Sequence, residues 1–126
     1  MKQKLKSLSL VAGAILAFTA MAGSMAADRV LSADEVKKLI SGNTVRVTQI
    51  NNAKQWSIFF AADGKGYESK DQARGTWEIK ENGEHCASWA VLKCAKVADI
   101  GGGKYARIKP NGDHAVTWTI EAGNKL

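Results

Sequence analysis

The sequence is poor in the residues on which most enzymes and metal sites depend. Its 126 residues include two histidines and two cysteines, and the Gly-x-Ser-x-Gly motif that carries a hydrolase nucleophile is absent. A catalytic site needs a nucleophile, a base within reach and a stabilising group, and zinc ligands recur at regular spacings that two histidines and a bridged cysteine do not supply. The sequence therefore predicts a protein that is not an enzyme, with no catalytic residue, metal site or cofactor.

The few titratable candidates stand in polar surroundings. His85 and His114 each lie next to a turn, so we expect both at the surface. Gly101 to Lys104 lacks the ending and the following helix of a phosphate-binding loop, and we expect a flexible turn there. We also expect solvated positions for Asp63, Glu68, Glu78 and Glu81.

Runs of basic residues interleaved with aromatics are also missing, so the sequence predicts no nucleic-acid partner. The formal net charge is +6, but three lysines belong to residues 1–26. The remaining chain has 15 Lys and Arg against 12 Asp and Glu, a net charge of +3. A charge of this size favours solubility and weak attraction to anionic surfaces.

The long apolar run stands at the start of the chain. Three lysines precede the stretch from Leu8 to Phe18, and Ser24-Met25-Ala26 fits the small-x-small rule of a secretory cleavage site. The run is too short to span about 30 Å of hydrocarbon as a stable helix. The sequence predicts a bacterial signal peptide over residues 1–26 and a periplasmic or secreted domain over residues 27–126, with no stable membrane insertion after cleavage. An uncleaved anchor is the alternative.

The two cysteines predict one disulfide, because the compartment outside the cytoplasm is oxidising. Bridged cysteines keep their Cα atoms within about 7 Å, whereas eight extended steps from Cys86 to Cys94 would cover about 26 Å. If the two are bonded, the chain therefore reverses near Trp89-Ala90-Val91, although none of the residues between the cysteines is Gly, Pro, Asn or Asp. Two free or intermolecular thiols remain the alternative.

A single segment, residues 32–41, predicts a helix. Ser32 and Glu35 form a capping box, and Leu31 and Val36 stand where a hydrophobic staple would lie. Gly42 supplies the C-terminal stop. The apolar stripe of this helix predicts a plug that packs on the rest of the domain.

After Gly42, short β-prone stretches alternate with turn signals about every ten residues, and no crossover is long enough for parallel pairing. The sequence therefore predicts a mainly β fold: a small antiparallel up-and-down, lipocalin-like barrel of about eight strands with one N-terminal helix. The expected strands are residues 44–50, 55–61, 65–69, 74–80, 84–88, 92–97, 104–109 and 114–120.

Alternation along these strands selects the side chains that face inward. Val45 and Val47, Trp56, Ile58 and Phe60, Trp77 and Ile79, and Val116, Trp118 and Ile120 share the inner face. The large rings either fill a small core or line a cavity at the barrel mouth. Under the second interpretation the ligand-binding residues are Trp56, Phe60, Trp77 and Trp118, and an internal cavity of about 300 Å³ or more would indicate a ligand.

A series of short motifs also resembles a known family. In order they are the helix ending Leu39-Ile-Ser-Gly-Asn-Thr44, Gly75-Thr-Trp77, Cys86, Trp89, Cys94, Tyr105, Pro110-Asn-Gly112 and Gly123-Asn124. The series is similar to the DUF995-like family of small secreted proteobacterial proteins over nearly all of residues 27–126. The resemblance implies an exported domain of undefined activity with a lipocalin-like barrel, and it brings no catalytic residue. The chain departs from the family in the apolar, glycine-free link between its cysteines.

Two functions remain open at this point. The first is non-enzymatic binding of a small apolar ligand inside the barrel. The second is an interaction module, such as an inhibitor of an envelope hydrolase or an envelope stress factor, with contacts from the loops at the barrel ends. Its candidate residues are Gly101 to Lys104, Lys70, Arg74 and Arg107. The sequence does not give the oligomeric state.

Overall fold

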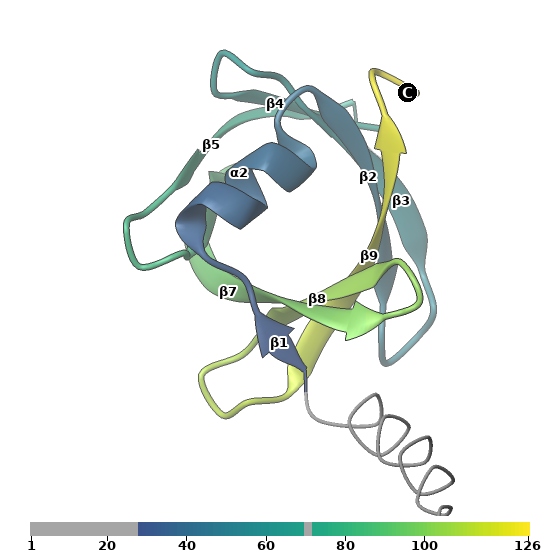
Figure 1. The fold of residues 1–126 in the computed structure, drawn as a ribbon. Helices are drawn as coiled ribbons and strands as arrows, with labels where there is room; N and C mark the ends of the chain where they lie inside the picture. The colour runs from purple at the N-terminus through teal and green to yellow at the C-terminus, as the bar shows by residue number, and fades with distance from the viewer. Residues whose placement is uncertain (1–27, 70–71) are drawn as a thin grey trace, which may run out of the picture.

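The computed structural model describes residues 28–69 and 72–126. The predicted signal peptide, residues 1–26, lies outside the described residues. Nine strands and one helix make up the described part, and the chain winds round a closed ring (Figure 1). Their bounds are β1 Arg29–Val30, α2 Ala33–Ile40, β2 Asn43–Gln49, β3 Gln55–Phe60, β4 Lys65–Glu68, β5 Arg74–Ile79, β6 His85–Ser88, β7 Leu92–Gly101, β8 Lys104–Ile108 and β9 His114–Ala122.

The strands from β2 to β9 close an antiparallel barrel. Each pairs with the next along the chain, and the ring closes because β9 also pairs with β2. Closure satisfies the backbone groups that an open sheet would leave at its edges. The predicted small up-and-down barrel of about eight strands is confirmed, and each predicted strand corresponds to an observed one.

The connections follow the turn chemistry of the sequence. The β3–β4, β5–β6 and β8–β9 turns contain Gly64, Gly83 and Gly112, with φ of +93°, +93° and +94°. These left-handed values cost glycine little and strain other residues, which explains why Asp-Gly and Asn-Gly pairs predict the turns. Short turns of this kind join neighbouring strands and so enforce the antiparallel order.

The disulfide prediction is confirmed. Cys86 and Cys94 are bonded and stand directly opposite each other on β6 and β7, with Cα atoms 4.0 Å apart. The pairing of Ser88 with Leu92 places the reversal at Trp89-Ala90-Val91, as predicted. A disulfide-bonded pair of this kind is typical of proteins that fold outside the reducing cytoplasm.

Helix α2 covers one end of the barrel (Figure 1). Val36 and Ile40 are fully buried, Leu31 is almost so, and Leu39 packs against the same core. Just after the helix, the Gly42 amide donates to the Phe60 carbonyl, which joins this end of the helix to β3. The predicted helix, its plug-like packing and its capping box are thus confirmed.

Strand β1 is an element that the sequence does not signal. It pairs with β7 through Arg29 opposite Asp99 and Val30 opposite Ala98. This stretch of β7 extends beyond the end of the short β6, whose last pair on this side is His85 with Ala95. A two-residue strand has no recognisable periodicity, so it could not be predicted from the sequence. It forms because this part of β7 leaves an edge free for pairing.

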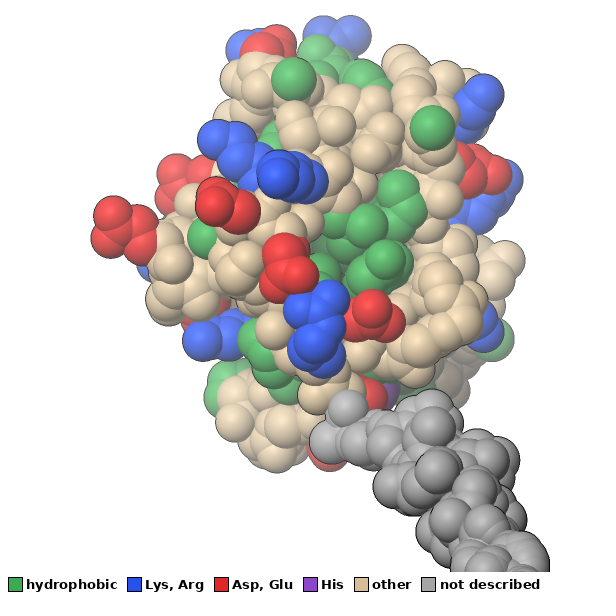
Figure 2. Space-filling model, viewed as in Figure 1, with side chains coloured by type: hydrophobic (Ala, Val, Ile, Leu, Met, Phe, Trp, Pro, Cys, Tyr) green, Lys and Arg blue, Asp and Glu red, His purple; other side chains and the backbone are tan. Residues whose placement is uncertain are grey.

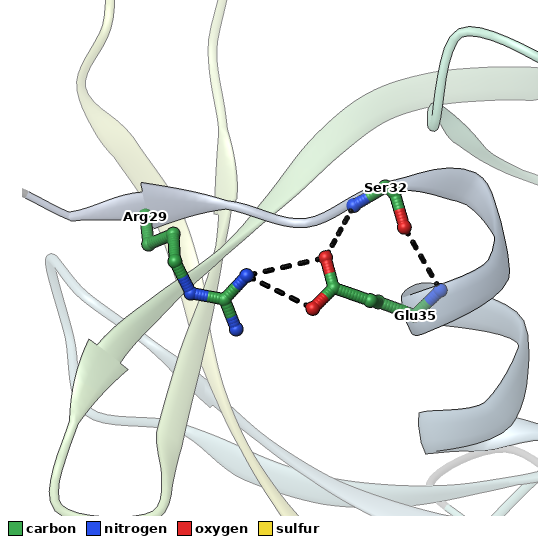
Figure 3. Close-up of polar contacts among 3 residues, drawn as sticks. All are labelled: Arg29, Ser32 and Glu35. Atoms are coloured by element: carbon green, nitrogen blue, oxygen red, sulfur yellow. Dashed lines mark hydrogen bonds and ion pairs between the residues drawn. The ribbon is translucent and has the colours of Figure 1, made fainter.

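Polar contacts fix the joint between β1 and α2 (Figure 3). The Ser32 hydroxyl accepts from the Glu35 amide at 3.2 Å, and the Glu35 carboxylate accepts from the Ser32 amide at 2.9 Å. Arg29 Nη1 donates to the same carboxylate at 2.9 and 3.2 Å. Hydrogen bonds from the Ser32 backbone and from Arg29 lower the pKa of Glu35. These contacts orient the helix across the barrel end.

The core occupies the barrel interior beneath the helix. Phe60 lies at its centre, with ring centroids 5.7 Å from Trp77, 5.1 Å from His85 and 6.3 Å from Trp118. The inner faces predicted from alternation are confirmed, since all of their members belong to the core cluster or pack against it. The face that carries the helix presents charges of both signs around a group of apolar side chains (Figure 2).

Candidate functional site

The candidate site is a cavity inside the barrel, toward the end opposite α2. Its volume is about 190 Å³. Phe60 and His85 stand at the helix ends of β3 and β6, whereas Trp89 comes from the β6–β7 turn at the opposite end. Arg107 and Trp118 contribute from within β8 and β9. The walls are otherwise mostly apolar, and the cavity is lined by Val47, Trp56, Ile58, Phe60, Glu68, His85, Ala87, Trp89, Arg107, Val116 and Trp118.

Three of the four predicted ligand-binding residues come together here. Trp56, Phe60 and Trp118 line the cavity. Trp77 does not: its ring packs edge-on to Phe60, and its indole Nε1 donates to the Ala61 carbonyl at 2.9 Å. Its place in β5, beside the β3–β4 turn, puts it at the helix end. Both alternatives for the large rings therefore apply: Trp77 fills the core, and Trp56, Phe60 and Trp118 line the cavity.

The prediction that His85 lies at the surface is wrong. Its side chain is 1% exposed and packs edge-on against Phe60 and Trp118. Burial, with a smaller contribution from the charge of Arg107, lowers the pKa of His85 from 6.5 to about 3. The imidazole is therefore neutral at pH 7. His114, by contrast, lies half-exposed and forms a 2.6 Å contact with Asp28.

Arg107, a candidate contact residue of the predicted interaction module, faces the barrel interior instead. Arg107 stands within β8 opposite Val97 and Val116, so its side chain shares their inner face. Its Nη2 donates to the carbonyls of His85 and Lys93 at 3.2 and 3.3 Å. Burial lowers the pKa of Arg107, but a guanidinium keeps its proton in proteins. The cavity wall thus carries a fixed positive charge.

Trp89 comes from the disulfide-pinned turn and enters the barrel. Its ring lies against Gly66 and Gly75, where an added Cβ would come within 2.9 and 2.6 Å of the ring atoms. The two glycines are paired across β4 and β5. Their missing side chains leave the room that the indole occupies.

A second cavity, of about 260 Å³, adjoins the first. Ala87, Trp89 and Arg107 line both, and Val91 and Lys93 border the outer one. A broader hollow of about 780 Å³ lies between the β2–β3 and β8–β9 turns, where polar residues dominate the lining. The aromatic rings and buried polar groups gather round the smallest of these three spaces, so it is the strongest candidate site.

Glu68 also differs from its prediction as a solvated carboxylate, because it is half-buried and lines the aromatic cavity. The register pairs it with Ile58, whose side chain faces inward. Glu68 already has an interaction partner. Its position places an acidic group on the wall formed by β4, separate from the arginine on β8.

The residues proposed for protein contacts are dispersed. Gly101 to Lys104 form the β7–β8 turn at the helix end, whereas Arg74 begins β5 toward the other end. Lys70 lies outside the described residues. Exposed apolar side chains occur elsewhere, at the β6–β7 turn, where Val91 is 65% and Leu92 59% exposed.

Within residues 28–69 and 72–126, no three His, Cys, Asp or Glu side chains are grouped so that they could hold a metal ion. In the same part of the chain, no helix has the length and apolarity needed to cross a bilayer. Comparison with protein-family models, with curated proteins and with solved structures finds no match for this chain. The resemblance to DUF995-like proteins therefore stays a prediction.

Proposed function

We propose that the protein is an exported, non-enzymatic binding barrel that holds a small apolar ligand. The observation that carries the proposal is the cavity of about 190 Å³ lined by Trp56, Phe60 and Trp118. The disulfide and the predicted signal peptide support a periplasmic or secreted location.

The volume limits the ligand. This cavity is smaller than the 300 Å³ that the sequence argument set, and typical small-molecule pockets have about 300–1,000 Å³. An apolar cavity of about 150 Å³ accepts benzene. The inner cavity therefore takes about one aromatic ring or a short chain, and any longer part of the ligand extends past Trp89 into the outer cavity.

The test uses the four indole N–H signals of ¹⁵N-labelled protein, followed by NMR during titration with toluene and with indole. Binding in the cavity shifts the Trp56 and Trp118 signals and leaves Trp77 nearly unchanged, because Trp77 lies outside the cavity and its N–H is held by Ala61. Uniform small shifts of all four signals, or none up to millimolar probe, would refute the proposal.

A matched pair of variants checks the location. Ala87→Leu adds a branched side chain to the cavity wall and should abolish the toluene-induced shifts. Ala62→Leu makes the same change at an exposed position in the β3–β4 turn and should leave them intact. Equal binding by both variants would place the probe elsewhere.

A second candidate function is favoured by the exposed apolar tip of the β6–β7 turn. Val91 and Leu92 are exposed at a turn that the Cys86–Cys94 disulfide holds in place, and a contiguous exposed apolar patch often marks a protein-interaction site. Retention of one envelope protein from periplasmic extract, lost in a Val91→Ser/Leu92→Ser variant, would favour this function. Retention that salt abolishes in both proteins would reject it.

A further inference from the structure

We infer that the ligand of this cavity carries an acidic group, which the guanidinium of Arg107 and the imidazole of His85 bind while the aromatic walls hold its apolar part. The inference rests on the function proposed above and specifies the chemical class of the ligand as a small carboxylic acid or a similar anion. It follows from two side chains that line the same space and keep buried polar atoms without a hydrogen-bond partner among the described residues.

Arg107 has an unused donor and an unbalanced charge. Its Nη2 is occupied by two backbone carbonyls, but its buried Nε has no hydrogen-bond partner among the described residues. In that same part of the chain, Arg107 forms no ion pair. A buried cation with no counter-charge is costly, and a guanidinium suits a carboxylate because it offers donors in a planar fork. An acid bound beside Arg107 would remove that cost.

His85 adds a second unsatisfied group. Both of its ring nitrogens are buried and without a hydrogen-bond partner within residues 28–69 and 72–126. A neutral imidazole has one N–H donor in either tautomer, and buried polar groups in folded proteins nearly always find a partner. The ring lines the same cavity as Arg107, whose Nη2 donates to the His85 carbonyl. One anionic group in this corner can therefore accept from both side chains.

The other charged groups around the two cavities agree with this placement. Lys93 borders the outer cavity and adds positive charge on the Arg107 side. Glu68 lies on β4, four strands away from β8 round the ring in either direction, and already has a partner. An acid is therefore attracted to the β8 side of the cavity, and a basic ligand at Glu68 is the opposing outcome of the test.

The main experiment uses wild-type protein at pH 7 and four probes of one-ring size: benzoate, benzamide, benzylamine and toluene. Dissociation constants come from the Trp56 and Trp118 indole shifts. Because a hydrogen bond to a charged group is stronger than a neutral one, we expect benzoate to bind on the order of tenfold to a hundredfold more tightly than benzamide. Benzylamine should bind more weakly than toluene.

Two variants that remove the same charge locate the acid. Arg107→Gln should reduce the preference for benzoate over benzamide to about one. Arg46→Gln should keep it, because Arg46 lies on the outer surface, with its Nε 3.6 Å from the Glu121 carboxylate. If Arg107→Gln does not fold, the wild-type comparison of the four probes still decides the inference.

The outcomes separate the two proposals. Binding of toluene and benzamide with no preference for benzoate would overturn the acidic ligand and leave the binding barrel standing, as would tighter binding of benzylamine. Failure of all four probes to shift Trp56 and Trp118 would overturn the proposed function and this inference together. A benzoate preference that persists in Arg107→Gln and is lost in Arg46→Gln would assign the anion to the surface.

Discussion

Between pH 6.5 and about pH 5, acid should destabilise this protein mainly through one side chain, His85. In the unfolded chain a histidine takes up a proton near pH 6.5, but burial lowers the pKa of His85 in the folded protein to about 3. Between these values the unfolded state binds more protons than the folded state. The free energy of unfolding is therefore highest above about pH 6.5 and falls as the pH is lowered toward 3.

The size of the effect follows from the two pKa values of His85. Each unit below 6.5 costs about 1.4 kcal/mol, so the change from pH 7 to pH 4.5 should remove about 2.5 kcal/mol. The group is almost fully buried, so solvent screening does not reduce this figure greatly. Against a typical domain stability of about 5–15 kcal/mol, the loss is large.

Urea unfolding, followed by tryptophan fluorescence at pH 7, 6, 5 and 4.5, measures this loss. Carboxylates also contribute below pH 5, including Glu35, whose lowered pKa acts in the same direction. The effect of His85 is therefore isolated by comparing wild type with His85→Gln. Between pH 7 and pH 4.5, the free energy of unfolding of His85→Gln should fall by about 2.5 kcal/mol less than that of wild type. His114→Gln keeps His85 and should follow the wild type. Parallel pH profiles of wild type and His85→Gln would show that the buried imidazole is not the cause.

Three further predictions concern the disulfide, the tryptophan in the turn and the helix cap. Replacing Cys86 and Cys94 with Ala should lower the free energy of unfolding by about 2.5 kcal/mol, since the bond closes a short loop; a melting temperature that drops by less than about 3 °C would contradict this. Gly75→Ala should destabilise by about 2 kcal/mol or more, because its Cβ would meet the Trp89 ring and a backbone carbonyl of β6. A Gly75→Ala/Trp89→Ala variant should not recover, as the carbonyl clash remains, and full recovery in urea unfolding would refute this geometry. Ser32→Ala should cost about 1 kcal/mol by removing the N-cap acceptor of α2, and an unchanged urea midpoint would show that tertiary packing alone holds the helix.

Local chemistry in the sequence was enough to predict the barrel. Asp63-Gly64 and Asn82-Gly83 define turns because glycine tolerates positive φ, and short turns admit only antiparallel neighbours. The capping box of Ser32 predicts the helix start because its contacts span three residues. These signals are local, so they can be recognised in the sequence before the fold is known.

The polar half of the candidate site was not predicted because alternation was followed only through apolar residues. His85 is two positions from the inward Ala87, so the period of two places it on the inner face. The adjacent turn and its polar neighbours instead predicted a surface position for His85. Arg107 shares a face with Val116 only through the pairing of β8 with β9, and a basic residue near a strand end usually marks the surface.

The turns, the helix and the antiparallel order of neighbouring strands follow from local sequence, because each depends on residues close together in the chain, and the spacing of Cys86 and Cys94 requires a reversal if the two are bonded. Tertiary structure decided what the barrel encloses. Trp89 enters the barrel because Gly66 on β4 and Gly75 on β5 have no side chain there. His85 and Arg107 both line the volume that the surrounding side chains leave unfilled. Such a volume depends on how side chains from strands far apart in the sequence pack together, so no single stretch of the sequence predicts it.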